Sequence, residues 1–205
     1  MKDTFFHLEE SKRVRVIGAA MAEFAEKGFD RASLDSIVRR ASISKGGLYE
    51  YIDTKEDLFD YALQWAHDRM GEHITANRPE SGFPSDPVSR ALFIAGVAVE
   101  FYLKETECIA FLGAAAVTEN PSMRQLARKA FESYFDGLFS DCDFTPFRFP
   151  RDRIIAILRW ILEKTRNEFM DTLRETRDAA SCRGAYLAEW DFFASAIRSG
   201  IYRGD

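Results

Sequence analysis

Apolar residues recur every three or four positions through most of the 205-residue chain, and this spacing constrains the fold more than any other feature. Such a period lines up one face of an α-helix, whereas a half-buried β-strand needs strict alternation of apolar and polar residues. No stretch combines that alternation with the turn residues of a β-hairpin. We therefore predict an all-α fold, with helices over Ser11–Lys27, Ser33–Ala41, Lys55–Ala76, Ala91–Leu103, Glu105–Val117, Ser122–Asp141, Arg151–Asp178 and Ser181–Tyr202.

The stretch Ser42–Tyr51 separates two of these helices and contains a further, shorter one. Ser33 is a suitable N-cap for the helix before it, and Thr54 for the helix after it. Leu48 and Ile52 lie four residues apart, so one side of the short helix can pack inward, while its other side carries polar and aromatic residues. A helix, a tight turn and a short helix with such an outer face are typical of a DNA-reading helix-turn-helix.

The net charge of −5 gives no support to binding nucleic acid through a broad basic surface. Residues 11–55 hold 9 basic and 6 acidic side chains, which is a local charge of +3. Contact with phosphates would therefore have to come from a few well-placed groups.

Several other classes of protein are disfavoured by the sequence. No segment approaches the roughly 18 apolar residues of a membrane span, and the acidic N-terminus is unlike a signal peptide, so we expect a cytoplasmic protein without a membrane partner. Cys108, Cys142 and Cys182 are odd in number and widely spaced, which favours free thiols over a zinc site or disulfides. The sequence holds no catalytic signature such as GxSxG or HExxH, so we expect no enzyme, no metal and no cofactor.

From about Val16 to Phe59 the sequence resembles the TetR/AcrR family of bacterial transcriptional repressors, notably in AEFAEKGFDRASLDSIVRRASISKGGLYEYIDTKEDLF. The positions that fit the family pattern are Phe24, Gly28, Phe29, Ser33, Ile37, Ala41, Ser44, Gly46, Leu48, Tyr49, Tyr51, Lys55 and Leu58. The resemblance covers about the first quarter of the chain. It implies an N-terminal helix-turn-helix domain followed by a helical-bundle domain that binds a ligand and forms a dimer.

Three departures from the family pattern fall in the turn and the short helix. Ser42 stands where the family usually has glycine, and a left-handed backbone there would cost a serine more than a glycine. Gly47 replaces a frequent threonine, which removes one hydroxyl contact to DNA. Glu50 would repel phosphate, but it could accept a hydrogen bond from a cytosine amino group.

The resemblance also implies roles for individual residues. Lys45, Gly46, Gly47, Glu50 and Tyr51 would face the major groove, Tyr49 and Lys55 would contact phosphate, and Ser33 and Ser44 would contact the DNA backbone. A structural role is an alternative for several of them. Ser33 and Ser44 can serve as N-caps, Tyr49 as a half-buried packing residue and Lys55 as a solvated lysine.

A proline-rich segment over residues 78–87 predicts a mobile loop, and we divide the chain into a DNA-binding domain (1–55), a connecting helix (56–76) and a ligand-binding and dimerisation domain (77–205). Aromatic and aliphatic residues that follow the helix-turn-helix suggest an effector pocket, although each could be ordinary core. Glu100 could orient the effector, or it could pair with an arginine such as Arg159 or Arg166 or face solvent. The candidate pocket residues are Trp65, Glu100, Phe101, Cys108, Phe111, Phe131, Tyr134, Phe135, Trp160 and Phe169.

The last two long helices carry bulky apolar residues, and the resemblance implies that they pair with the same helices of a second copy. The candidate interface residues are Leu158, Phe169, Leu187, Trp190, Phe193 and Ile197. A twofold dimer would place two recognition helices one DNA turn apart on a palindrome.

The sequence thus predicts a repressor that a small hydrophobic or amphipathic effector releases from double-stranded operator DNA. The competing hypothesis is a helical module that binds a small molecule or lipid and does not bind DNA. The salt dependence of DNA binding distinguishes the two.

Overall fold

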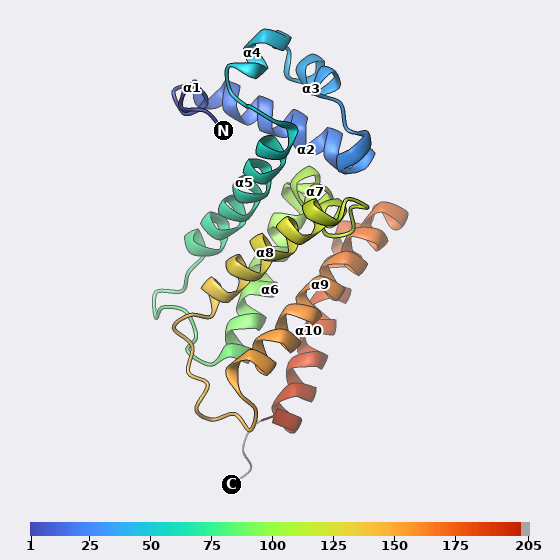
Figure 1. Ribbon diagram of the computed structural model, residues 1–205. Coiled ribbons are helices and arrows are strands. Elements are labelled where there is room, and N and C mark those ends of the chain that lie inside the picture. Colours follow the sequence, from blue (N-terminus) through green and yellow to red (C-terminus); the bar gives the residue numbers. More distant parts are fainter. Residues whose placement is uncertain (202–205) are drawn as a thin grey trace. The chain divides into compact units, whose positions relative to one another are not determined.

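The computed structural model describes residues 1–201, and within that range the chain forms ten helices and no strand (Figure 1). The predicted all-α class is confirmed. The helices are α1 (Asp3–Phe6), α2 (Glu10–Arg31), α3 (Leu34–Ala41), α4 (Lys45–Tyr49), α5 (Lys55–Ala76), α6 (Pro87–Lys104), α7 (Thr106–Ala116), α8 (Pro121–Leu138), α9 (Arg151–Thr176) and α10 (Ala179–Ile201).

Each predicted long helix is present, and most boundaries differ by only a few residues. The predicted end of the last helix at Tyr202 lies outside the described residues. The largest change at a helix end is at Gly28, which we expected to terminate the first long helix. Its φ of 68° and ψ of 169° kink the backbone without a left-handed cap, and helical structure continues to Arg31.

The helices group into two compact units, which are described separately. The first comprises residues 1–69 and 105–132, and the second comprises residues 70–104 and those from Ser133 onwards. The helix-turn-helix therefore shares its unit with α7. The division into domains 1–55, 56–76 and 77–205 remains a prediction about function.

The core of the first unit contains a cluster of four phenylalanines. Phe24 and Phe29 from α2 meet Phe59 from α5 at ring-centroid distances of 5.1 and 5.3 Å. Phe111 from α7 completes the cluster, 5.5 Å from Phe59. All four side chains are at most 4% exposed, so burial of their rings joins α2, α5 and α7.

Arg90 of α6, in the second unit, binds the proline-rich segment 78–87 that we expected to be a mobile loop. Its buried guanidinium donates to the carbonyl of Pro84 at 2.7 Å, and its Cζ lies 5.0 Å from the centre of the Phe83 ring. The carbonyl of Ser85 also accepts from the backbone N–H of Asp143 at 2.9 Å. These contacts attach the proline-rich segment to its unit, and its mobility remains a prediction.

Replacing Ser42 with glycine is expected to raise the free energy of unfolding by about 0.5–1 kcal/mol. Ser42 adopts the left-handed conformation (φ 52°, ψ 47°), which costs a serine more than the glycine that the family usually has at this position. Urea denaturation measures the change. Ser33→Gly is the control, because Ser33 has a φ of −116° and gains nothing from glycine. A Ser42→Gly variant that is less stable than the parent would contradict the prediction.

Candidate nucleic-acid interface

The turn between α3 and α4 is built from local hydrogen bonds. The backbone N–H of Ser42 donates to the carbonyl of Arg39, and that of Ile43 to the carbonyl of Val38, both at 3.2 Å. The Ser44 hydroxyl then accepts from the backbone N–H of Gly47 at 3.0 Å. Ser44 is therefore the N-cap of α4, which confirms the structural role considered for it.

The short helix α4 has a buried side and an exposed side. Leu48 is 0% exposed, and Ile52, just after the helix, is also 0% exposed. The N-cap Ser44 is exposed, and so are Lys45, Gly46, Tyr49 and Glu50 on or just after α4, which we call the reading face. Five of the predicted DNA-contacting residues thus lie together at the surface.

Gly47 is constrained by the cap that precedes it. A Cβ atom at this position would lie 3.1 Å from the Ser44 Oγ, so a larger residue would press on the capping hydroxyl. Gly46 has open space around its Cα, and no contact within the described residues requires a glycine there.

Tyr51 does not belong to the reading face, so the prediction that it faces the major groove is wrong. The side chain is only 8% exposed, and its ring packs edge-on against Phe5 of α1 at 6.0 Å. The Lys12 ammonium lies 5.5 Å from the ring centre. The helix α1, which the sequence did not predict, also pairs with this segment through the backbone N–H of Lys2 and the carbonyl of Tyr51, 2.8 Å apart.

Lys55 also has a different role from the predicted phosphate contact. Its ammonium donates to the carbonyls of Phe29, Asp30 and Ala32 at 2.8, 3.3 and 3.2 Å, and it lies 4.5 Å from the Phe29 ring centre. An ammonium has three N–H donors, so these carbonyls use all of them. Lys55 therefore holds the end of α2 against the start of α5.

Two other predicted DNA-contacting groups are placed where a ligand can reach them. The Lys45 ammonium lies 2.8 Å from Asp35 of α3, and this hydrogen bond raises the pKa of Lys45 above its usual value. Both side chains are largely exposed, and an exposed ion pair exchanges readily for another anion. The Ser33 side chain is exposed and forms no cap hydrogen bond with α3, unlike Ser44 on α4.

Glu23 of α2 is a positioning residue that the sequence analysis missed. It is 2% exposed, and its carboxylate accepts from the Ser33 backbone N–H at 3.2 Å and from the Ser36 hydroxyl at 2.7 Å. The Arg40 guanidinium lies 3.4 Å away. Glu23 thus contacts residues at both ends of α3. Its spacing of three from Ala20 was the available signal, because it places a charge on the apolar face of α2.

Comparison with known proteins shows what the segment containing α2 to α4 resembles. Residues 16–62 match the sequence pattern of the bacterial regulatory proteins of the tetR family. Over these residues the chain is similar to the tetR family. The biofilm operon regulator IcaR of Staphylococcus aureus, a negative transcriptional regulator, is 29% identical over 79 residues, which are 38% of this chain and 42% of IcaR. The chain therefore spans about two fifths of the length of the curated relatives it matches most strongly.

Solved structures of transcriptional regulators share the fold over most of the chain. A regulator from Chloroflexus aurantiacus superposes with a TM-score of 0.70 at 20% identity, covering 99% of both chains. The regulator FadR of Bacillus subtilis, solved in complex with stearoyl-CoA, gives a TM-score of 0.60 at 16% identity, covering 90% of this chain and 98% of FadR. At these identities the likeness shows the fold.

The ten residues predicted to line an effector pocket are divided between the two units, with Trp65, Cys108, Phe111 and Phe131 in the first. Phe111 fills the phenylalanine cluster, and burial raises the pKa of the Cys108 thiol to about 12. Neighbouring side chains cover these two residues completely or almost completely.

In the second unit, Glu100 is exposed and forms an ion pair with Arg183 at 2.5 Å, so the structural alternative holds, though with a different arginine from those considered. Trp160 is 58% exposed and faces away from the core. Phe101 and Phe135 are each 2% exposed and belong to the core. Phe169 lines a cavity between α9 and α10.

The predicted dimer interface requires a similar correction. Leu158, Phe169, Trp190 and Ile197 are between 0 and 9% exposed, because they pack inside their own unit. Leu187 and Phe193 are partly exposed. The apolar side chains that α9 and α10 present to solvent are instead Ile157, Trp160 and Phe192, which are 38, 58 and 65% exposed.

Within residues 1–201 the chain has neither a cluster of metal ligands nor a helix suited to crossing a membrane. No group of three or more histidine, cysteine, aspartate or glutamate side chains is placed to hold a metal ion in that part of the chain. None of the helices described is both long enough and apolar enough to cross a membrane.

Proposed function

We propose that the chain is a cytoplasmic transcriptional repressor without enzymatic activity, which binds a palindromic operator as a homodimer and is released by a small hydrophobic or amphipathic effector. The observation that carries DNA binding is the reading face, where Lys45, Tyr49 and Glu50 stand exposed on a short helix held by the Ser44 cap. A short helix with such a surface can enter the major groove.

Dimerisation is supported by the apolar side chains that α9 and α10 expose. Ile157, Trp160 and Phe192 are large, and a second copy would remove them from water. A twofold axis would repeat the reading face and so match the symmetry of a palindrome. An effector that favours one dimer geometry over another would change the spacing of the two reading faces, and with it the affinity for DNA.

The direct experiment is to measure the binding of the purified protein to the DNA upstream of its own gene. We expect a dimer in solution and a specific complex that weakens steeply as the salt concentration rises, because phosphate binding releases counterions. A monomer without a sequence-specific complex would overturn the proposal. It would favour the alternative of a helical ligand-binding module.

Substitutions in the reading face are expected to separate base contacts from phosphate contacts. Lys45→Ala and Glu50→Ala should each change the preferred base at one operator position by roughly tenfold, since one good base contact is worth about 1–3 kcal/mol. Tyr49→Phe removes a hydroxyl that would contact phosphate, so it should weaken binding about equally on all sequences. The measurement is affinity for a set of operators with single-base changes.

Lys27→Ala is the control for these variants, because it removes an exposed lysine of α2 outside the reading face. Its base preference should match that of the parent protein. If Lys45→Ala, Glu50→Ala and Tyr49→Phe all weakened every operator equally, the assigned roles would be wrong.

A further inference from the structure

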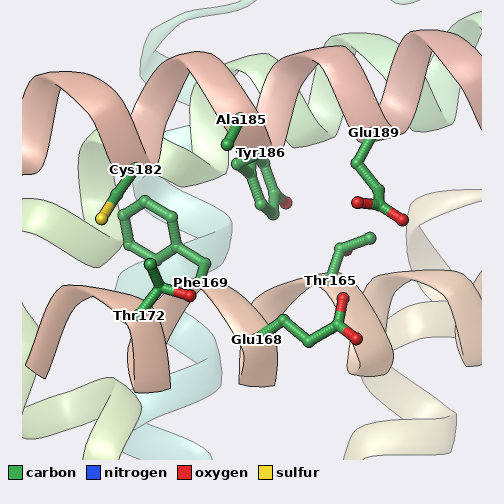
Figure 2. A pocket seen from close by; sticks show the side chains of 8 residues that line it. All are labelled: Thr165, Glu168, Phe169, Thr172, Cys182, Ala185, Tyr186 and Glu189. Atoms are coloured by element: carbon green, nitrogen blue, oxygen red, sulfur yellow. The ribbon is translucent and has the colours of Figure 1, made fainter. Parts of the chain in front are cut away.

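A cavity of about 270 Å³ lies between α9 and α10 in the second unit (Figure 2). These helices run alongside each other after the turn at Arg177, where the backbone is left-handed (φ 56°, ψ 20°) (Figure 1). The cavity is roughly nine times the ~30 Å³ that one water molecule occupies in the liquid. It therefore suits a small metabolite rather than a long acyl chain.

One wall of the cavity is aromatic and rigid. Phe169 of α9 and Tyr186 of α10 are each 4% exposed, and their rings meet edge to face at 5.5 Å. The Tyr102 ring of α6 supports both, at 5.8 Å from Phe169 and 5.9 Å from Tyr186. A flat apolar ligand can pack on such a wall without distorting it.

The cavity also has an acidic end, formed by Glu168 of α9 and Glu189 of α10 (Figure 2). Lys164 is the cation beside them, with its ammonium 2.5 Å from Glu168 and 3.4 Å from Glu189. Hydrogen bonding to Glu168 raises the pKa of Lys164, so this lysine stays charged. Two carboxylates share one ammonium, which leaves one negative charge for a ligand to balance.

A buried hydroxyl lies between the aromatic wall and the acidic end. The Tyr186 hydroxyl meets no group at full hydrogen-bonding geometry among the described residues, although the side chains of Tyr102, Thr165 and Trp190 lie near enough to interact with it. In Figure 2 its hydroxyl end points toward the side where Thr165 and Glu189 lie. Burial raises the pKa of Tyr186 well above its usual value, so the hydroxyl keeps its proton. A ligand atom could form a better-aligned hydrogen bond with this hydroxyl than these neighbours do.

We propose that this cavity binds a small organic cation, an amine with a flat apolar body. The ammonium would lie between Glu168 and Glu189, and the body would pack on Phe169 and Tyr186. The cavity residues lie on α9 and α10 and include no residue of the reading face, so amine binding can be measured on the free protein without DNA. A protein that failed to bind its operator could still bind the amine, so the two proposals fail separately.

Three probes that share an indole ring and differ in charge test the proposal by calorimetric titration of the full chain. Tryptamine is cationic, tryptophol is its neutral alcohol counterpart and indole-3-acetate is anionic. We expect saturable binding of one tryptamine per chain, binding of tryptophol at least about tenfold weaker, and still weaker binding of indole-3-acetate. No binding of tryptamine, or equal affinity for tryptamine and tryptophol, would overturn the proposal.

Substitutions then locate the bound probe. Glu189→Gln preserves the shape of the side chain and removes the unbalanced charge, so tryptamine should bind about tenfold more weakly. Tyr186→Phe keeps the ring and removes the buried hydroxyl, which should also weaken binding. Glu175→Gln is the matched control, since Glu175 is an exposed glutamate of α9 outside the cavity. If Glu189→Gln and Glu175→Gln bound tryptamine as tightly as the parent protein, the assigned site would be wrong.

Discussion

Replacing Glu23 with alanine is expected to lower the free energy of unfolding by about 3 kcal/mol and to weaken operator binding by at least about tenfold. The carboxylate is buried in α2 and accepts from the Ser33 N–H and the Ser36 hydroxyl, with the Arg40 guanidinium 3.4 Å away. Its removal leaves the Ser33 N–H and the Ser36 hydroxyl without their acceptor in a partly buried site, which is costly, while Arg40 keeps Glu26 as a partner. Because α3 directly precedes the turn into α4, a displaced α3 also displaces the reading face.

Glu26→Ala is the matched control, since Glu26 also binds Arg40 but is about half exposed. Hydrogen bonding to Arg40 lowers the pKa of Glu26, yet water can replace that contact in the variant. Chemical denaturation and operator binding should both show a much smaller effect than for Glu23→Ala. Operator affinity is compared where both variants are folded. Equal losses in the two variants would refute a positioning role for Glu23.

Replacing Arg90 with methionine is expected to lower the free energy of unfolding by about 3 kcal/mol. The Arg90 side chain is 4% exposed, and its guanidinium donates to the carbonyls of Pro84 and Leu138 at 2.7 and 2.8 Å. It also donates to both carboxylate oxygens of Asp141, at 3.0 and 3.2 Å, which lowers the pKa of Asp141. Methionine keeps the apolar stem of the side chain and leaves all four acceptor oxygens without their donor.

Arg174→Met is the control for this variant. Arg174 of α9 forms an ion pair with Asp171 at 2.9 Å, but both side chains are more than half exposed. Exposed pairs of this kind contribute little to stability. Chemical denaturation should therefore separate the two variants clearly. A stability loss for Arg90→Met no larger than that for Arg174→Met would contradict the role assigned to Arg90.

The helix-turn-helix was accessible from sequence because its determinants are local. The Ser44 cap involves Gly47, three residues away, and Thr54 and Asp57 exchange two hydrogen bonds of 3.0 Å across three residues. The left-handed backbone at Ser42 also follows from the short turn between two helices. Spacing and residue type contain this information, since the interacting groups are close along the chain.

The pocket and dimer residues could not be selected from the sequence, because helical spacing identifies an apolar face but does not say what covers it. In α9 and α10 the most apolar face, with Leu158 and Trp190, packs within the same chain. The large apolar side chains left for a partner are Ile157, Trp160 and Phe192. Only their exposure in the folded chain distinguishes them from the apolar side chains of the core. The same reasoning applies to Glu100, which lies in an apolar run yet is exposed beside Arg183.

The sequence by itself determined that the chain is helical, where the short helix α4 lies and how that helix is capped, because these properties depend on residues within about one helical turn. Only the tertiary structure decided which side chains are available. It directs Lys55 to carbonyls 23 to 26 residues away, covers Tyr51 with α1 and buries Glu23 against α3. These outcomes depend on groups far apart in the chain that meet only when the helices pack, and no periodicity in the sequence encodes such pairings.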